Sequence, residues 1–189
     1  MNSLSTPKYR LLLAAVLAVL MLLTRSNQLD WTEVLPSASL AVFFLAGFYL
    51  HSYIGLIVFS ILAFGIDYWV VYFGAEGCFT SAYGYIFIGY AVVWQAAKWA
   101  GEHQQLHQLA GAIKIITVAL LSISAAFLIS NASFYLFSGN FSDLSLVDYV
   151  ARVLRYYQSY LSAPLIYLAV AGVIHLLVHK RNAELELSQ

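Results

Sequence analysis

Long apolar runs, separated by short polar connections, constrain the fold of this chain more than any other feature. A helix needs about 20 apolar residues to cross the hydrocarbon core of a membrane. Six segments approach that length: residues 9–24, 35–50, 54–73, 81–99, 112–137 and 161–179. Because 62% of the residues are hydrophobic and only 10% are charged, the sequence predicts an all-α integral membrane protein. We expect residues 1–189 to form a single domain of six transmembrane helices.

The first apolar run, residues 11–23, follows Lys8 and Arg10, as the hydrophobic part of a signal peptide would. The polar segment TRSNQLD comes next, where a signal peptide would have a small-residue cleavage site. We therefore expect this run to be retained as the first span.

The distribution of lysine and arginine predicts the orientation, because cytoplasmic connections carry an excess of these residues. With the N-terminus inside, the cytoplasmic side holds Lys8, Arg10, Lys98, Lys114, Lys180 and Arg181, and the other side holds Arg25, Arg152 and Arg155. This bias predicts a multi-pass protein of the cytoplasmic (inner) membrane with both termini in the cytoplasm. The loop GAEGCFTSAYGY, residues 74–85, would then face the outside.

Charge and cysteine content exclude several classes of protein. Nine basic and nine acidic residues give a net charge of zero, so the chain offers no basic surface for a nucleic acid. Cys78 is the only cysteine, which excludes an internal disulfide, a CxxC redox pair and a thiolate-rich zinc site. The sequence contains no GxxxxGK[ST] motif, and we expect no ATP site of the P-loop type.

An amphipathic helix is predicted before the last span. Apolar residues recur at helical spacing over residues 146–161, while Asp148, Arg152 and Arg155 share another face. Such a helix would lie at the extracytoplasmic surface. Two roles stay open for it: a helix that lies in the interface, or a lid whose arginines contact a ligand.

Asp67 has the highest free-energy cost of membrane insertion in this sequence, because it is an acid about six positions before the outer end of the third predicted span. An aspartate at the middle of a membrane costs roughly 2.5–3.5 kcal/mol on insertion scales. Such acids normally face a cavity or a partner. Asp67 could therefore pack against a nearby tyrosine or contact a ligand.

Further polar and aromatic side chains would lie at the same outer level. Amides in membrane helices often serve only to join helices, and tyrosines gather at membrane interfaces for physical reasons alone. Convergence favours a site, since small-molecule pockets combine an apolar lining with a few polar groups. We expect an outward-facing pocket that includes Asp67, Cys78, Tyr83, Tyr85, Asn131, Tyr135 and Arg152.

Cys78 lies between Gly77 and Phe79 in the outer loop. It could be an inert loop thiol. A glycine lets a ligand approach the backbone closely, and a thiolate is a soft ligand that suits a transition metal. Cys78 is therefore a candidate to supply one axial bond to a metal whose other ligands come from its own organic ring.

A lone cysteine before AYGY, the acid of GID upstream and SNASFYLFSG downstream together resemble the BtuM-type cobalamin transporters. These are relatives of the S-components of energy-coupling factor (ECF) importers, and the likeness covers residues 11 to about 179. The resemblance implies an ECF S-component-like fold of six helices, with cobalamin (vitamin B12) as the transported ligand. It also implies that Cys78 is the axial ligand to cobalt, with Asp67, Tyr85 and Arg152 in the pocket.

The same resemblance implies a partner. S-components dock their transmembrane coupling subunit through small residues of the first helix, and Ala14 and Ala18 have that AxxxA spacing. We therefore expect a lipid membrane and an ECF energy-coupling module as partners, and no nucleic acid.

The expected function is cobalamin or corrinoid uptake across the cytoplasmic membrane. Cys78 would also act as the catalytic residue of an ancillary decyanation of cyanocobalamin. An S-component for another small vitamin, of thiamine or flavin type, is the alternative, with Cys78 incidental. A thiol enzyme is disfavoured because the chain has no resolving cysteine and its histidines map to the cytoplasmic side, and an assembly subunit would make Asp67 replaceable.

Overall fold

The computed structural model of this chain describes residues 7–25, 36–73, 79–103, 106, 108–139 and 144–187. Within these ranges the chain forms six α-helices and no strand. The helices are α1 (Pro7–Arg25), α2 (Ser39–Leu50), α3 (Tyr53–Phe73), α4 (Tyr85–His103), α5 (Leu109–Phe137) and α6 (Leu146–Leu187). The prediction of an all-helical chain is confirmed for the described residues.

Four of the described helices are long and apolar enough to cross a membrane. They are α1, α3, α5 and the part of α6 over Leu146–Arg181. This architecture is compatible with a multi-pass membrane protein. The second predicted span is shorter than expected, because α2 has 12 residues and a helix of that length extends only ~18 Å.

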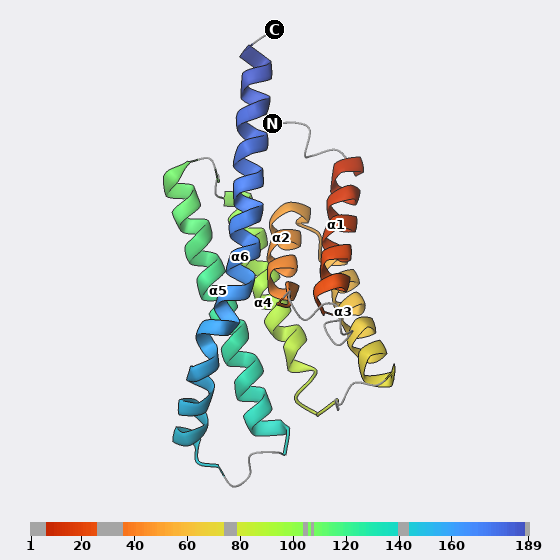
Figure 1. Ribbon diagram of the computed structural model, residues 1–189, viewed down its shortest axis with the longest axis vertical. Coiled ribbons are helices and arrows are strands. Elements are labelled where there is room, and N and C mark those ends of the chain that lie inside the picture. The colour runs from red at the N-terminus through yellow and green to blue at the C-terminus, as the bar shows by residue number, and fades with distance from the viewer. Residues whose placement is uncertain are drawn as a thin grey trace.

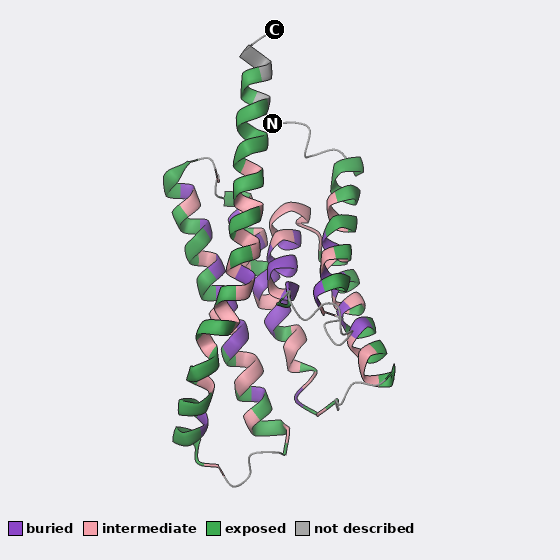
Figure 2. Cartoon of the chain, in the orientation of Figure 1, coloured by how far each residue is buried: buried purple, intermediate pink, exposed green. Residues whose placement is uncertain are grey.

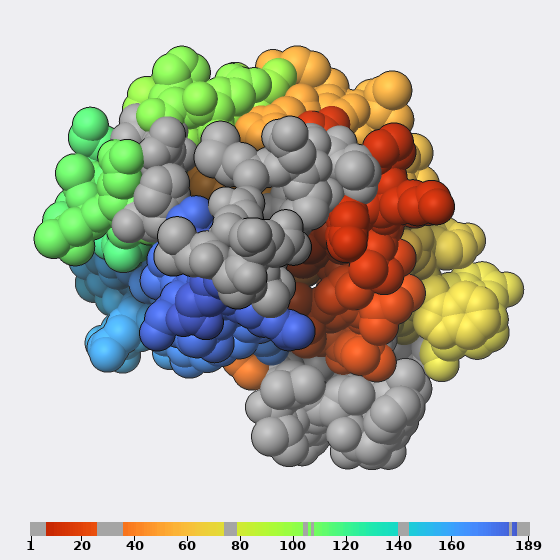
Figure 3. All heavy atoms as spheres, turned by 90° about the horizontal axis from the view of Figure 1, so that it is seen from above, coloured from red at the N-terminus to blue at the C-terminus, as the bar shows by residue number. Residues whose placement is uncertain are grey.

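The helices run up and down the long axis of the molecule, and the two termini lie at the same end (Figure 1). The end of α3, the start of α4, the end of α5 and the start of α6 lie toward the opposite end. In the view from above, the atoms of α3 lie at the edge of the molecule, beside α1 (Figure 3). The start of α4 is thus at the end far from the start of α1, and Cys78 lies outside the described residues.

The core is centred on α2 and α4. Helix α2 contacts α1, α3, α4 and α6, and the buried positions of Figure 2 gather on α2 and on the facing side of α4. The ring of Phe43 stacks on that of Tyr90, with 4.1 Å between the ring centroids. Trp94 is fully buried beside them. Apolar contacts along α2 thus hold this helix inside the bundle, although it is too short to cross a membrane by itself.

Gly47 is a point of close approach between α2 and α4 in this core. A β-carbon at Gly47 would lie 2.6 Å from the carbonyl oxygen of Trp94 and 3.2 Å from the β-carbon of Ala97. Only glycine leaves room for the two backbones at this distance.

Helix α6 corrects one part of the sequence prediction. The amphipathic segment and the last span were expected to be separate helices, but a single helix of 42 residues contains both. Pro164 lies inside it, where it removes one backbone N–H donor. Membrane helices tolerate such a proline when neighbouring groups satisfy the freed carbonyl, so the change from an amphipathic to an apolar pattern is not a helix boundary.

Replacing Gly47 with alanine should lower stability, whereas the same change at Gly172 should not. Alanine normally stabilises a helix relative to glycine by up to ~1 kcal/mol, and no atom would lie within 4 Å of a β-carbon at Gly172. At Gly47 the added methyl group collides with backbone, and we expect a loss of about 1–3 kcal/mol. Thermal unfolding of both variants in detergent measures this, and equal melting temperatures would contradict the close α2–α4 contact.

Candidate functional site

An ion pair joins the end of α1 to the middle of α3. Arg25 Nε donates to Asp67 Oδ1 and Arg25 Nη2 donates to Asp67 Oδ2, each over 2.6 Å. The two side chains are 10% and 21% exposed. Arg25, which the orientation rule counted among the charges of an outer connection, is instead the last residue of α1 and lies largely buried against Asp67.

Three hydroxyl groups make further hydrogen bonds with this pair. Arg25 Nη1 donates to Ser39 Oγ over 2.8 Å and to Tyr90 Oη over 2.6 Å. On the other side, Tyr83 Oη donates to Asp67 Oδ2 over 2.7 Å. We refer to Arg25, Ser39, Asp67, Tyr83 and Tyr90 as the Arg25–Asp67 cluster. It connects α1, α2, α3, α4 and the turn before α4.

Thr24 fixes the position of Arg25 relative to α2. Its side chain is fully buried; Oγ1 donates to the Leu20 carbonyl oxygen over 2.8 Å and accepts from the Ala38 N–H over 3.1 Å. The bond to Ala38 satisfies a backbone donor at the start of α2, where the first N–H groups have no partner inside the helix. Ser39 therefore begins α2 within reach of the Arg25 guanidinium.

An aromatic group lies next to the Arg25–Asp67 cluster. The ring centroid of Phe79 is 5.8 Å from that of Phe64, 6.5 Å from that of Tyr68 and 4.7 Å from that of Tyr83. We call Phe64, Tyr68, Phe79 and Tyr83 the aromatic platform. Tyr83 belongs to both groups, so the platform is linked by one side chain to Asp67.

Cys78 lies outside the described residues, but its neighbour in the chain does not. Cys78 is bonded directly to Phe79, and adjacent Cα atoms are about 3.8 Å apart across a trans peptide bond. Phe79, the first described residue after Cys78, packs on the aromatic platform.

A second group of predicted site residues joins α5 to the start of α6. Tyr135 Oη donates to the Leu144 carbonyl oxygen over 2.9 Å, and its ring lies 4.6 Å from that of Tyr149. Tyr149 Oη in turn donates to the carbonyl oxygen of Asn131 over 2.9 Å. The Asn131 amide nitrogen donates to the Phe127 carbonyl oxygen within α5 over 2.8 Å. These contacts hold the α5–α6 corner.

Arg152 is exposed on α6. It lines a surface groove of about 510 Å³ together with Asp148, Ala151, Arg155 and Tyr156. The groove has both acidic and basic walls. Arg152 is therefore at the surface of the α5–α6 corner and not in the Arg25–Asp67 cluster.

Tyr85 packs against the end of α5. Its ring stacks on that of Phe137, with a centroid distance of 4.9 Å and an interplanar angle of 6°. In the same region, Ser81 Oγ donates to the carbonyl oxygen of Phe137. The residues of the predicted pocket therefore fall into separate groups. Asp67 and Tyr83 are hydrogen bonded to each other, and Asn131 and Tyr135 both lie at the α5–α6 corner. Tyr85 connects the start of α4 to the end of α5.

Ala14 and Ala18 are both half-buried in α1. Ala18 packs against the core, whereas the most exposed positions of α1 include Leu11 and Leu12. The pair thus lies at the border of the exposed face of α1.

Three members of the Arg25–Asp67 cluster were absent from the predicted site: Arg25, Ser39 and Tyr90. One signal in the sequence could have identified Arg25. It is the only base at the end of an apolar run on the same predicted side as Asp67, and a membrane acid usually pairs with such a base. Ser39 and Tyr90 carry no comparable signal, because neutral polar residues are common in membrane helices.

Among the described residues, no group of three or more His, Cys, Asp or Glu side chains could hold a metal ion. No family model and no curated protein matches this chain.

Breaking the Arg25–Asp67 pair on one side should be more harmful than removing both charges. Arg25→Gln leaves a largely buried carboxylate without its cation, at a cost on the order of 3 kcal/mol. The double variant Arg25→Gln/Asp67→Asn removes both charges and should recover much of that loss. Denaturant unfolding in detergent measures the cycle.

Arg155→Gln serves as the control, because this arginine is exposed on α6 and its loss should change stability by less than about 0.5 kcal/mol. If the effects of Arg25→Gln and Asp67→Asn simply add in the double variant, the two side chains do not interact.

Proposed function

We propose that this chain is a corrinoid uptake protein of the cytoplasmic membrane, in which Cys78 binds the cobalt of cobalamin as an axial ligand. One observation carries the proposal. The residue after Cys78, Phe79, packs on the aromatic platform, and that platform shares Tyr83 with a buried acid. A soft metal ligand, an apolar surface and a carboxylate therefore belong to one region of the chain.

The Asp67 carboxylate still has a hydrogen-bond acceptor position for a ligand. A carboxylate has about four acceptor positions, and the cluster uses three of them: two for Arg25 and one for Tyr83. The side chain is also 21% exposed. Asp67 Oδ1 can thus accept one further hydrogen bond, as the amide side chains at the edge of a corrin ring would donate.

The aromatic platform suits the other part of such a ligand. A corrin ring is broad and largely apolar on its faces, and aromatic side chains bury large areas against such surfaces. Phe79 is 40% exposed and Tyr68 is 54% exposed, so both rings have surface to offer. In this proposal Tyr85, Asn131, Tyr135 and Arg152 border the ligand from the α4–α5 and α5–α6 sides.

Decyanation would follow from the same bond. The Cys78 sulfur forms a bond to cobalt(III), the cobalt–cyanide bond breaks, and cyanide leaves with the thiol proton as hydrogen cyanide. No electron is transferred in this exchange, so no reductant or second cysteine is needed.

The direction of transport in the proposal rests on the charge bias. The start of α1 and the start of α4 lie toward opposite ends of the molecule (Figure 1). Arg25 is part of the buried ion pair, so its charge is not counted in an outer connection. The excess of lysine and arginine on the predicted cytoplasmic side is then larger. With the termini in the cytoplasm, the site opens to the outside, and an ECF coupling module would dock beside Ala14 and Ala18 to supply energy.

Titration of the purified protein with cyanocobalamin tests the proposal. We expect the corrin absorption bands to shift on binding to the wild type and to stay unshifted with Cys78→Ser, because a hydroxyl is a much weaker ligand than a thiolate. Thr80→Ser, two residues along the same loop, is the matched control and should behave as the wild type.

An equal spectral shift in Cys78→Ser and wild type would exclude thiolate ligation. Absence of any corrinoid binding, together with a thiamine or flavin compound that co-purifies with the protein, would instead favour an S-component for another vitamin.

A further inference from the structure

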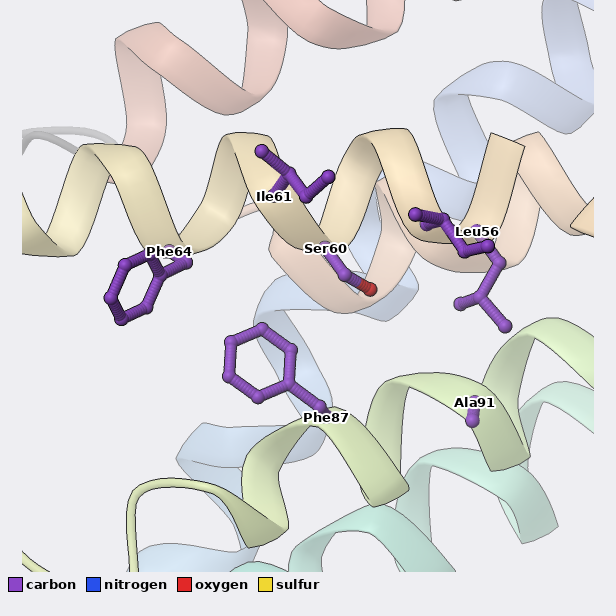
Figure 4. Close-up of a pocket in the computed structure, with 7 residues that line it drawn as sticks. Leu56, Ser60, Ile61, Phe64, Phe87 and Ala91 are labelled. Carbon is purple, nitrogen blue, oxygen red and sulfur yellow. The ribbon is translucent and has the colours of Figure 1, made fainter. Parts of the chain in front are cut away.

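Helices α3 and α4 form the walls of an apolar groove of about 410 Å³. Figure 4 shows its lining side chains: Leu56, Ser60, Ile61 and Phe64 from α3, with Phe87 and Ala91 from α4. The groove is open along the outer side of α3, where Ile61 is 66% exposed and Phe64 is 45% exposed. We propose that it binds one acyl chain of an anionic phospholipid, whose phosphate is held by Lys98. This inference does not depend on the proposed function.

The length of the groove matches one leaflet of a membrane. Helix α3 has 21 residues, enough at ~1.5 Å per residue to cross a hydrocarbon core of about 30 Å. Its lining residues on α3 run from Leu56 to Phe64, which corresponds to ~12 Å along the helix. The groove therefore covers most of the ~15 Å depth of one leaflet and begins about one turn after the start of α3.

Aromatic rings close the groove near the midplane. The ring centroids of Phe64 and Tyr83 are 6.2 Å apart, and those of Tyr83 and Phe87 are 5.6 Å apart. Beyond these rings lies the Arg25–Asp67 cluster, since Tyr83 donates to Asp67. An apolar chain in the groove would thus end against rings and not against the buried charges.

Polar groups lie beyond the other end of the groove, toward the start of α3. Tyr53 Oη donates to Gln95 Oε1 over 2.8 Å, which joins α3 to α4 one turn beyond Ala91. Lys98 Nζ lies 4.2 Å from the centroid of the Tyr53 ring. Ala91, Gln95 and Lys98 follow one another at helical i, i+4 and i+7 spacing on α4, so they continue the line of the groove.

The ammonium group of Lys98 can form an ion pair with a phosphate. Its Nζ lies 4.0 Å from Glu102 Oε1, at the limit of an ion pair, and the side chains of Lys98 and Glu102 are 18% and 44% exposed. A contact at this distance is weaker than a hydrogen-bonded ion pair. Lysine carries three donors on a flexible stem that reaches from apolar surface to the headgroup level, and basic sites at this level bind anionic lipid headgroups.

A lipid fits the groove better than a partner helix does. Membrane helices pack closely where small residues let their backbones approach. The outer rim of this groove instead carries large side chains, with Ile57 58% and Ile61 66% exposed. Those side chains keep a helix at a distance but leave room for a single chain.

Native mass spectrometry of the full-length protein tests this site, with phosphatidylglycerol and phosphatidylcholine of the same acyl chains as probes. The wild type should bind phosphatidylglycerol about fivefold more tightly, the size expected for one lysine facing an anionic headgroup. Lys98→Gln should remove the preference, while Lys114→Gln, an exposed lysine of α5, should keep it. Ala91→Leu or Ser60→Leu fills the groove and should lower the affinity for both lipids.

Equal affinity of the wild type for the two lipids would overturn the proposal, as would a preference that survives Lys98→Gln. Unchanged lipid binding in both groove-filling variants would also overturn it. So would a protein dimer that Ala91→Leu abolishes, because the groove would then hold a second copy of this chain. Helix content by circular dichroism identifies variants that fold.

Discussion

The ion pair between Arg25 and Asp67 is the interaction on which much of this bundle depends. Removing two charges from water costs several kcal/mol for each ion, and that cost is recovered only when geometry and hydrogen bonding are good. Here the guanidinium binds both carboxylate oxygens, and Ser39, Tyr90 and Tyr83 provide further hydrogen bonds. The end of α1, the start of α2, the middle of α3 and the turn before α4 must therefore stay together.

Helix α3 connects the Arg25–Asp67 ion pair to the aromatic platform and to the apolar groove. It lies at the edge of the bundle (Figure 3), where its inner side binds Arg25 and its flank, with Phe64 and Tyr68, supports the residue after Cys78. The half of α3 nearer the termini lines the apolar groove with α4. Tyr83 and Phe64 form the border between the two regions, so one helix separates a polar site from an apolar one.

Structural features that depend on a long run of residues, such as the helices, could be predicted from the sequence. The apolar runs predicted helices at all six places where the described chain has them, because the period and length of such runs depend little on tertiary contacts. Asp67 was identified as a residue that needs a partner, because its cost in an apolar helix is independent of the fold. Its bond to a tyrosine is among the interpretations that sequence alone left open, and Tyr83 makes it.

Features that depend on contacts between distant segments could not be read in this way. Arg25 and Asp67 are 42 positions apart, and no local pattern shows that the end of α1 meets the middle of α3. Tyr85 and Asn131 were grouped with Asp67 by their depth along the helices, yet depth does not say which faces meet; Tyr85 stacks on Phe137 and Asn131 bonds within α5. Continuity of α6 through Pro164 likewise depends on its surroundings.

The central claim of the proposed function is a bond between the Cys78 sulfur and cobalt, beside the aromatic platform that Tyr83 links to Asp67. Cobalt-edge X-ray absorption of the purified protein loaded with cobalamin measures the atoms bonded to the metal directly. We expect one sulfur neighbour in the wild type and none in Cys78→Ser. A wild-type spectrum with only nitrogen, oxygen or carbon neighbours would exclude thiolate ligation of the metal.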